Sequence, residues 1–222
     1  ASTFFRRCSR YSGDLFFPEY LEHRLKNVLA YKNLMIENVY GAEESTFEDM
    51  MDYLNTYGGE FKDYICDTGV FLREAAERGD RIMFEAQLGA LRDIDFGIYP
   101  YTSSSSTIAA YAPIGAGIPG IKLDSTVGIM KAYSSCVGEG PFTVEMEGDE
   151  AEALRKAGGE YGAATGRPRR VGAFDAVASR YGIRCQGADK IALTKLDVLS
   201  YLDSIPVCVA YEIDGKRVDE FP

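Results

Sequence analysis

YGAATGRPRRVGAFDAVASRYGIRCQGADKIALTKLD (Tyr161–Asp197) contains a loop, a short helix and an apolar strand in close succession. The segment AFDAVASRYG predicts the helix, and KIAL predicts a buried strand directly before the polar tetrapeptide TKLD. Strand-like and helix-like segments alternate in this way from residue 81 to the end of the chain. This alternation is typical of an α/β sheet. The sequence therefore predicts an α/β fold for residues 81–222.

The loop at the start of this stretch suits an anionic ligand. Gly162–Gly166 are small residues, and Arg167, Pro168, Arg169 and Arg170 follow directly. Bare backbone amides and guanidinium forks bind carboxylate or phosphate oxygens, although a solvated basic turn is the alternative interpretation. The net charge is −10, so the loop is a positive island in an acidic protein. Nucleic acid and anionic membranes need broad positive surface, so the composition favours a specific anion instead.

The composition argues against several classes of site. The 222 residues are 46% hydrophobic and 26% charged, as in a globular protein. The five cysteines are scattered without a CxxC pair, and His23 is the only histidine. Disulfide frameworks, zinc sites and Ser–His–Asp catalysis are therefore disfavoured, and a cytoplasmic location is predicted. No apolar run reaches membrane-spanning length.

The first third of the chain predicts a helical subdomain. Pro18 stands in the first turn of a helix that ends at Gly41, and Thr46 marks the start of a second helix. Gly58–Gly59 should interrupt that helix, and a third is expected over Glu60–Arg78. We therefore divide the chain into a helical subdomain (1–80) and an α/β part (81–222).

Further segments of the α/β part have strand or helix patterns. RIMFE (81–85), PFTVEM (141–146) and IPVCVAYEID (205–214) are expected strands. DEAEALRKAGGEYG (149–162) contains an expected helix that ends at Gly158–Gly159. STVGIMKAYSSCVG (125–138) mixes β-branched and small residues, and it is interpreted as a helix leading into a strand.

Three more patches have side chains suited to chemistry. Gln87 lies among the acids Glu85, Asp93 and Asp95, which turn and capping roles explain equally well. The hydroxyl run Thr102–Thr107 fits either a phosphate site at a helix start or a simple cap. In TKLD, the Asp197 carboxylate can accept hydrogen bonds from both N–H groups on one edge of guanine, and the aliphatic part of the Lys195 side chain can lie along the base. Lys and Asp after a strand are also common in turns.

Taken in order, RIMFE, LxDIDxGxYPYxxSS, GIMKAYSSCVGEGPFxxE, GxxTGRPRRVGxFD and ALTKLDVL resemble the adenylosuccinate synthetase family. The resemblance runs from about Arg6 to the C-terminus. It implies a P-loop-NTPase-like mixed or parallel sheet with a helical subdomain, and a ligase that joins IMP to L-aspartate using GTP and Mg²⁺. It also implies a homodimer, with no nucleic acid or membrane partner.

The resemblance carries over the following site residues by position. Gln87 would contact the reacting purine oxygen as the catalytic residue, and Arg6 would reach the IMP of the partner subunit. The implied IMP-binding residues are Arg6, Gln87, Ser103, Ser104, Val137 and Arg167. The implied aspartate-binding residues are Ala163, Ala164, Thr165, Gly166 and Arg167. The implied GTP-binding residues are Arg169, Lys195 and Asp197.

The sequence also departs from the family. The glycine-rich loop GDEGKGK, which supplies the catalytic base and most Mg²⁺ ligands, has no counterpart, so we expect the chain to lack full activity alone. Leu88 stands where the family has Gln, and Phe96, Ala164 and Ala173 replace other usual residues. Two further hypotheses stay open: a degenerate paralogue that binds purine nucleotides without chemistry, and a dimerisation fragment.

Overall fold

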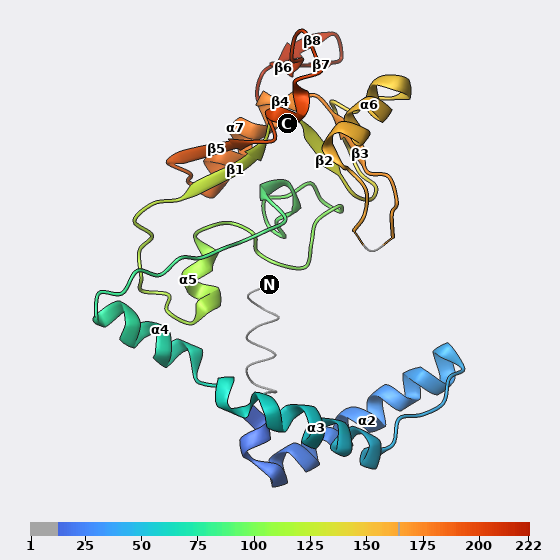
Figure 1. Cartoon of the computed structure of the whole chain (residues 1–222), viewed down its shortest axis with the longest axis vertical. Helices are drawn as coiled ribbons and strands as arrows, with labels where there is room; N and C mark the ends of the chain where they lie inside the picture. Colours follow the sequence, from blue (N-terminus) through green and yellow to red (C-terminus); the bar gives the residue numbers. More distant parts are fainter. Residues whose placement is uncertain (1–12, 164) are drawn as a thin grey trace. The chain divides into compact units, whose positions relative to one another are not determined.

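The computed structural model describes residues 13–163 and 165–222 and divides into two compact units (Figure 1). The first unit extends to Phe84 and includes Pro113–Gly120. The second contains Glu85–Ala112 and Ile121–Pro222.

The first unit is helical, as the sequence predicts. Its helices are η1 (Asp14–Phe16), α2 (Pro18–Tyr40), α3 (Phe47–Phe61), η2 (Lys62–Tyr64) and α4 (Thr68–Glu77). The expected ends of α2 are confirmed, because Pro18 begins it and Gly41 ends it with φ of 58°. The expected start of α3 is also confirmed, since the Thr46 side chain accepts a hydrogen bond from the Asp49 N–H at 3.0 Å.

The predicted interruption at Gly58–Gly59 is wrong, because α3 continues through both glycines to Phe61. A glycine inside a helix costs about 1 kcal/mol relative to alanine, which tertiary packing readily offsets. Gly58 also allows a close approach: a Cβ there would lie 2.9 Å from Leu15 Cδ2. The helix instead gives way to η2, and Asp67 begins α4 by accepting a hydrogen bond from the Val70 N–H.

The second unit mixes short strands and helices. The helix α5 (Tyr111–Ala116) begins in this unit and continues into the first. The other elements of the second unit are, in chain order, η3 (Ala90–Arg92), β1 (Val127–Lys131), β2 (Ser134–Cys136), α6 (Gly148–Gly158), β3 (Arg170–Gly172), β4 (Phe174–Asp175), α7 (Ala176–Gln186), β5 (Lys190–Thr194), η4 (Asp197–Leu199), β6 (Val207–Cys208), β7 (Tyr211–Ile213) and β8 (Lys216–Val218). The pairs β1–β5 and β4–β6 are parallel, whereas β2–β3 and β7–β8 are antiparallel. The mixed α/β prediction is therefore confirmed.

Two strand predictions are wrong. Residues 81–85 lie in no strand, and Met83 is 88% exposed. Residues 141–146 form a turn with a single bridge from Glu145 to Gly172. A Cβ at Gly172 would lie 2.0 Å from the Val144 carbonyl oxygen, so glycine is required for this close approach. Apolar runs alone do not reveal whether a partner strand is available.

The interpretation of residues 125–138 as a helix leading into a strand also needs correction. This segment contains the strands β1 and β2, and β1 pairs with β5 in register from Val127–Lys190 to Lys131–Thr194. Figure 1 shows β1 and β5 side by side. The core of the unit lies beyond their carboxyl ends and contains Ala132, Tyr133, Ala151, Leu154, Val171 and Leu199.

The β1–β5 pair is exposed on both faces, although parallel strands are usually covered on both. Val127 and Ile129 are 51% and 69% exposed, and Leu193 is 51% exposed on the opposite face. Exposed apolar faces and unpaired strand edges favour association between chains.

We therefore expect the chain to self-associate, and Ile129→Lys to weaken this association at least about tenfold, because burying an isoleucine contributes about 1.5–3 kcal/mol. Sedimentation velocity over a concentration series measures the effect. Ile213→Lys, at an exposed position of β7, is the control, and an equal effect of both variants would contradict the assignment of the contact to β1.

Candidate functional site

The TKLD segment lies at the carboxyl end of the β1–β5 pair. The last residue of β5, Thr194, accepts a hydrogen bond from the Ala132 N–H at 2.8 Å. Lys195 then has φ of 62°, which is uncommon for a residue other than glycine, and its side chain is exposed. Asp197 is exposed at the start of η4, and its carboxylate accepts no hydrogen bond within the described chain. In parallel α/β sheets, ligands bind beyond this end of the strands.

The arginine-rich loop is a narrow hairpin. The Arg169 N–H donates to the Glu160 carbonyl at 3.0 Å, and the Gly162 N–H donates to the Arg167 carbonyl at 2.8 Å. A Cβ at Gly162 would lie 2.7 Å from Thr165 Oγ1. Four predicted aspartate ligands, Ala163, Thr165, Gly166 and Arg167, are exposed at its tip. The fifth, Ala164, lies outside the described residues.

Arg169 is tied to the buried carboxylate of Glu160. Its Nη1 donates to Glu160 Oε2 at 3.0 Å. Glu160 Oε1 accepts from Lys131 Nζ at 2.7 Å and from the Tyr133 hydroxyl at 2.6 Å. Burial by itself raises the pKa of Glu160, but the hydrogen bonds from Lys131 and Tyr133 outweigh it and hold the pKa below its usual range. Burial and the Glu160 charge raise the pKa of Tyr133.

Arg170 has an internal structural role, which corrects the interpretation of three arginines as one anion site. Its guanidinium forms a two-pronged ion pair with Glu145 and donates to the Gly140 carbonyl at 2.9 Å. It also lies 5.2 Å from the centre of the Phe142 ring. These contacts hold the 138–145 loop in place, so Arg167 and Arg169 are the two arginines of the loop left for a ligand.

Arg92, which the sequence did not single out, connects two of the predicted IMP-binding segments. Its backbone carbonyl accepts from the Ser103 N–H at 2.8 Å. Its guanidinium donates to Cys136 Sγ at 2.8 Å and to the Tyr101 carbonyl. Val137 follows Cys136 and is 71% exposed. The fold thus brings the hydroxyl segment and the end of β2 together.

The hydroxyl run Thr102–Thr107 is not a helix start, because the next helix begins at Tyr111. Ser103 Oγ lies 3.2 Å from Ser105 Oγ, and the Thr107 hydroxyl donates to the Gly89 carbonyl at 2.8 Å. Ser104 is exposed. The phosphate-site interpretation thus rests on these hydroxyls and the loop backbone, without a helix N-terminus.

The predicted catalytic residue Gln87 is exposed, and its amide makes no hydrogen bond to the rest of the described chain. The next residue, Leu88, has φ of 79° and is 56% exposed. This left-handed conformation is rare for leucine and strained. Of the neighbouring acids, Asp93 is completely buried as a turn and capping residue, whereas Glu85 and Asp95 are exposed.

Some expectations find no counterpart in the described chain. Within residues 13–163 and 165–222, no group of three or more His, Cys, Asp or Glu side chains is arranged to hold a metal ion. These residues therefore do not fit Mg²⁺ by themselves. No helix in the same ranges is long and apolar enough to cross a membrane. Arg6 lies outside the described residues.

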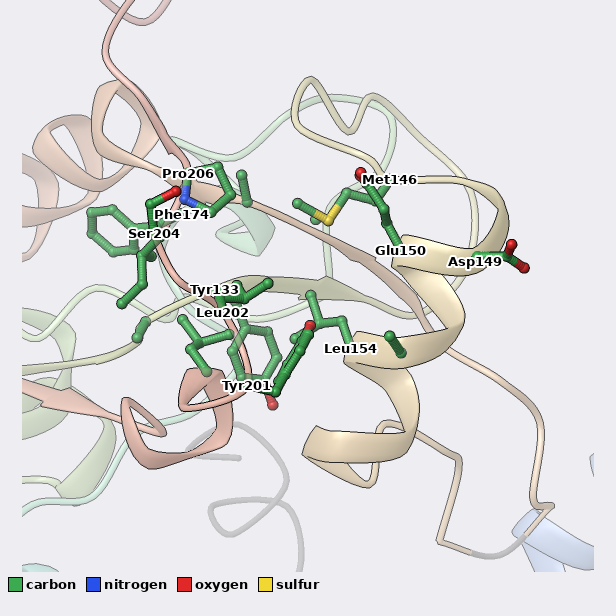
Figure 2. A pocket seen from close by; sticks show the side chains of 16 residues that line it. Tyr133, Met146, Asp149, Glu150, Leu154, Phe174, Tyr201, Leu202, Ser204 and Pro206 are labelled. Carbon is green, nitrogen blue, oxygen red and sulfur yellow. The ribbon is translucent and has the colours of Figure 1, made fainter.

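The second unit also contains an apolar cavity of about 550 Å³. Figure 2 shows its labelled side chains, among which Leu154 and Glu150 come from α6 and the Asp149 carboxylate points away from the apolar group. Tyr133, Phe174 and Tyr201 contribute aromatic rings to its lining. None of the site residues predicted from the sequence lines this cavity.

Comparison with known proteins gives a consistent result. The family model described as adenylosuccinate synthetase matches residues 2–222. The adenylosuccinate synthetases of Nocardioides sp. and Listeria innocua are each 43% identical over 209 residues, which is 94% of this chain and 48% or 49% of theirs. The fully ligated adenylosuccinate synthetase of Plasmodium falciparum superposes with a TM-score of 0.84 at 33% identity, over 95% of this chain and 50% of that one. The chain spans about half the length of these relatives, and it belongs to the adenylosuccinate synthetase family.

Proposed function

We propose that the chain is a segment of a ligase that forms adenylosuccinate, GDP and phosphate from IMP, L-aspartate and GTP in purine biosynthesis. In this reaction GTP phosphorylates the purine 6-oxygen, and the aspartate amine then displaces the phosphate. The observation that carries the proposal is the Lys195–Asp197 segment at the carboxyl end of β5, where the exposed Asp197 carboxylate has no acceptor role in the described fold.

This segment fits a guanine base. Guanine presents N1–H and an exocyclic amino group on one edge, and a single carboxylate accepts from both. Adenine presents an acceptor at N1, so Asp197 would oppose it. The left-handed backbone at Lys195 turns the chain directly after β5, which leaves the lysine stem exposed to lie along the base. The proposed phosphate donor is therefore GTP, with Arg169 contacting its phosphates.

The arginine-rich loop fits L-aspartate. Its tip presents Thr165, Gly166 and the exposed Arg167, whose guanidinium offers paired donors to a carboxylate. Closure of such a loop over the site would exclude water from a hydrolysable phosphoryl intermediate. Ala163 and Ala164 belong to the same proposed site through their backbone.

IMP would bind where Arg92 brings together the hydroxyl segment and the end of β2. Ser103 and Ser104 are proposed for its 5′-phosphate and Val137 for its ribose. Arg167 would bridge IMP and aspartate, and Arg6 of the partner subunit would complete the site in a cytoplasmic homodimer. Gln87 is the proposed contact to the 6-oxygen. Because the described residues do not fit Mg²⁺ alone, we expect the 222-residue chain to bind ligands without full turnover.

Thermal unfolding of the chain tests this proposal. A ligand at a hundred times its Kd adds about 2.7 kcal/mol to the free energy of unfolding. We expect GTP and IMP to raise the melting temperature and ATP to raise it less. An unchanged melting temperature with every nucleotide would contradict the proposed binding function.

A further inference from the structure

Glu160 and Lys131 have no ligand contact in the proposed function, yet their side chains form a polar cluster with Arg169. The Glu160 side chain is 3% exposed and is bonded to two cations, whereas Lys131 and Arg169 are each 33% exposed. A buried carboxylate thus lies beneath two cations that still reach the surface. The cluster stands at the carboxyl end of β1, where Lys131 pairs in register with Thr194 of β5.

Both cations are held in place on several sides. The Arg169 N–H donates to the Glu160 carbonyl, and the Arg169 carbonyl accepts from Arg155 Nε at 3.0 Å. The Lys131 ammonium also donates to Ser135 Oγ at 2.6 Å. The Glu160 carboxylate is the acceptor that the two charged ends share, so it holds them close to each other.

The cluster retains N–H groups without acceptors and a net positive charge. Two cations and one carboxylate leave a formal charge of one positive unit. Arg169 Nε is buried and has no hydrogen-bond partner in the described chain. The recorded bonds of Lys131 use two of its three N–H groups. A bound anion would supply an acceptor for the remaining Lys131 N–H and a negative charge that balances the cluster.

We propose that Glu160 is a positioning residue that holds Arg169 and Lys131 together as a preformed receptor for a nucleotide phosphate, which adds Lys131 to the ligand-contacting residues. The inference rests on the proposed function, because it takes the ligand to be the GTP bound beside Lys195 and Asp197. Preformed donors bind an oxyanion without the cost of ordering two long side chains on binding.

Substitution at Glu160 separates positioning from charge. If Glu160 only neutralised the site, Glu160→Gln would raise the positive charge and tighten GTP binding, most strongly at low salt where screening is weak. Glu160→Asp would then change nothing, because the charge is kept. If Glu160 positions the cations, both variants bind GTP more weakly, because aspartate is one methylene too short to reach Lys131 and Arg169 together.

The experiment measures the Kd for GTP by titration calorimetry on the 222-residue chain and its variants, well below their melting temperatures. We expect Glu160→Asp and Glu160→Gln each to weaken binding at least about tenfold, since hydrogen bonds to charged groups contribute that much. Glu145→Gln is the matched control: it breaks the similar ion pair to Arg170, and its Kd should change less than about twofold.

A double-mutant cycle identifies the residue through which Glu160 acts. Combined with Arg169→Ala, Glu160→Asp should weaken binding less than it does in the unaltered chain, because only its effect through Lys131 remains, whereas combined with Asp197→Ala its full effect should add. Equal additivity in both cycles would indicate a general structural defect and overturn the inference. Unchanged or tighter GTP binding by both Glu160 variants would overturn this inference and leave the proposed function intact. Absence of GTP binding by the unaltered chain would overturn the proposed function as well.

Discussion

Replacing Asp93 by alanine is expected to remove at least about 3 kcal/mol from the free energy of unfolding of the second unit. Asp93 is completely buried. Its Oδ1 accepts from the N–H groups of Asp95 and Phe96 at 2.9 and 3.0 Å, and its Oδ2 accepts from the Thr107 N–H at 2.6 Å. Alanine would leave these three backbone donors, of which the Thr107 N–H is buried, without their acceptor, and a buried unpaired donor costs about 1–3 kcal/mol.

Urea unfolding followed by circular dichroism measures this loss. Asp95→Ala is the matched control, because Asp95 lies two residues away with an exposed side chain. An exposed substitution of that kind usually changes stability by less than about 0.5 kcal/mol. Similar losses for the two variants would show that the 93–107 loop does not depend on the buried carboxylate.

The pKa of Asp93 gives this prediction a pH dependence. Burial by itself raises the pKa of Asp93, but hydrogen bonds from the backbone of Thr107, Asp95 and Phe96 outweigh it and hold the pKa below its ordinary value. A carboxyl whose pKa is depressed by folding stabilises the protein above its unfolded pKa of about 3.9, and the stabilisation is lost as the pH falls through the folded value.

The stability difference between the unaltered chain and Asp93→Asn should therefore be constant near neutral pH and shrink below about pH 4. Unfolding curves at several pH values between neutral and strongly acidic would measure it. A difference that stays constant throughout would assign the role of Asp93 to its shape and not to its charge.

The helices were predicted better than the strands because their signals are local. Pro18, Gly41 and Thr46 fix helix ends through their own backbone geometry or side-chain bond. A strand needs a partner that the local sequence does not show. RIMFE and KIAL are both apolar runs, yet only the second has a partner in the described chain, where it pairs with Val127–Lys131.

The candidate site could also be predicted only in part, because some of its residues are recognised from local motifs and others only from tertiary contacts. Motifs revealed Lys195, Asp197 and the arginine-rich loop, because their residue types already indicate the chemistry. Glu160 and Arg92 were missed, since only tertiary contacts show that one holds two cations and the other joins two loops. A signal for Glu160 was present: it is a carboxyl placed between the helix-ending Gly159 and a loop with three arginines.

If the chain binds GTP as proposed, Asp197→Asn is expected to switch its nucleotide preference from GTP to XTP. A carboxylate accepts from both N1–H and the exocyclic amino group of guanine. Asparagine has one acceptor oxygen and one donor NH₂. Its oxygen can still accept from N1–H, but its NH₂ would face the guanine amino group, donor against donor. Xanthine has an oxygen at that position, so the same NH₂ would donate to it.

The expected changes in GTP and XTP affinity follow from the two hydrogen bonds that the substitution alters. Losing one charge-assisted hydrogen bond costs about 1.5–3 kcal/mol, so GTP binding should weaken at least tenfold while XTP binding becomes measurable. Competition titration of the chain with GTP, XTP and ATP would show the change. Asp203→Asn, at another exposed carboxylate six residues further along, is the matched control and should retain the GTP preference.

A gain of XTP binding is more informative than a loss of GTP binding. Damage to the fold would weaken the binding of every nucleotide, whereas a switch from one base to another requires direct contact with the base edge. If Asp197→Asn bound both nucleotides as weakly as ATP, Asp197 would support the loop after β5 without reading the base.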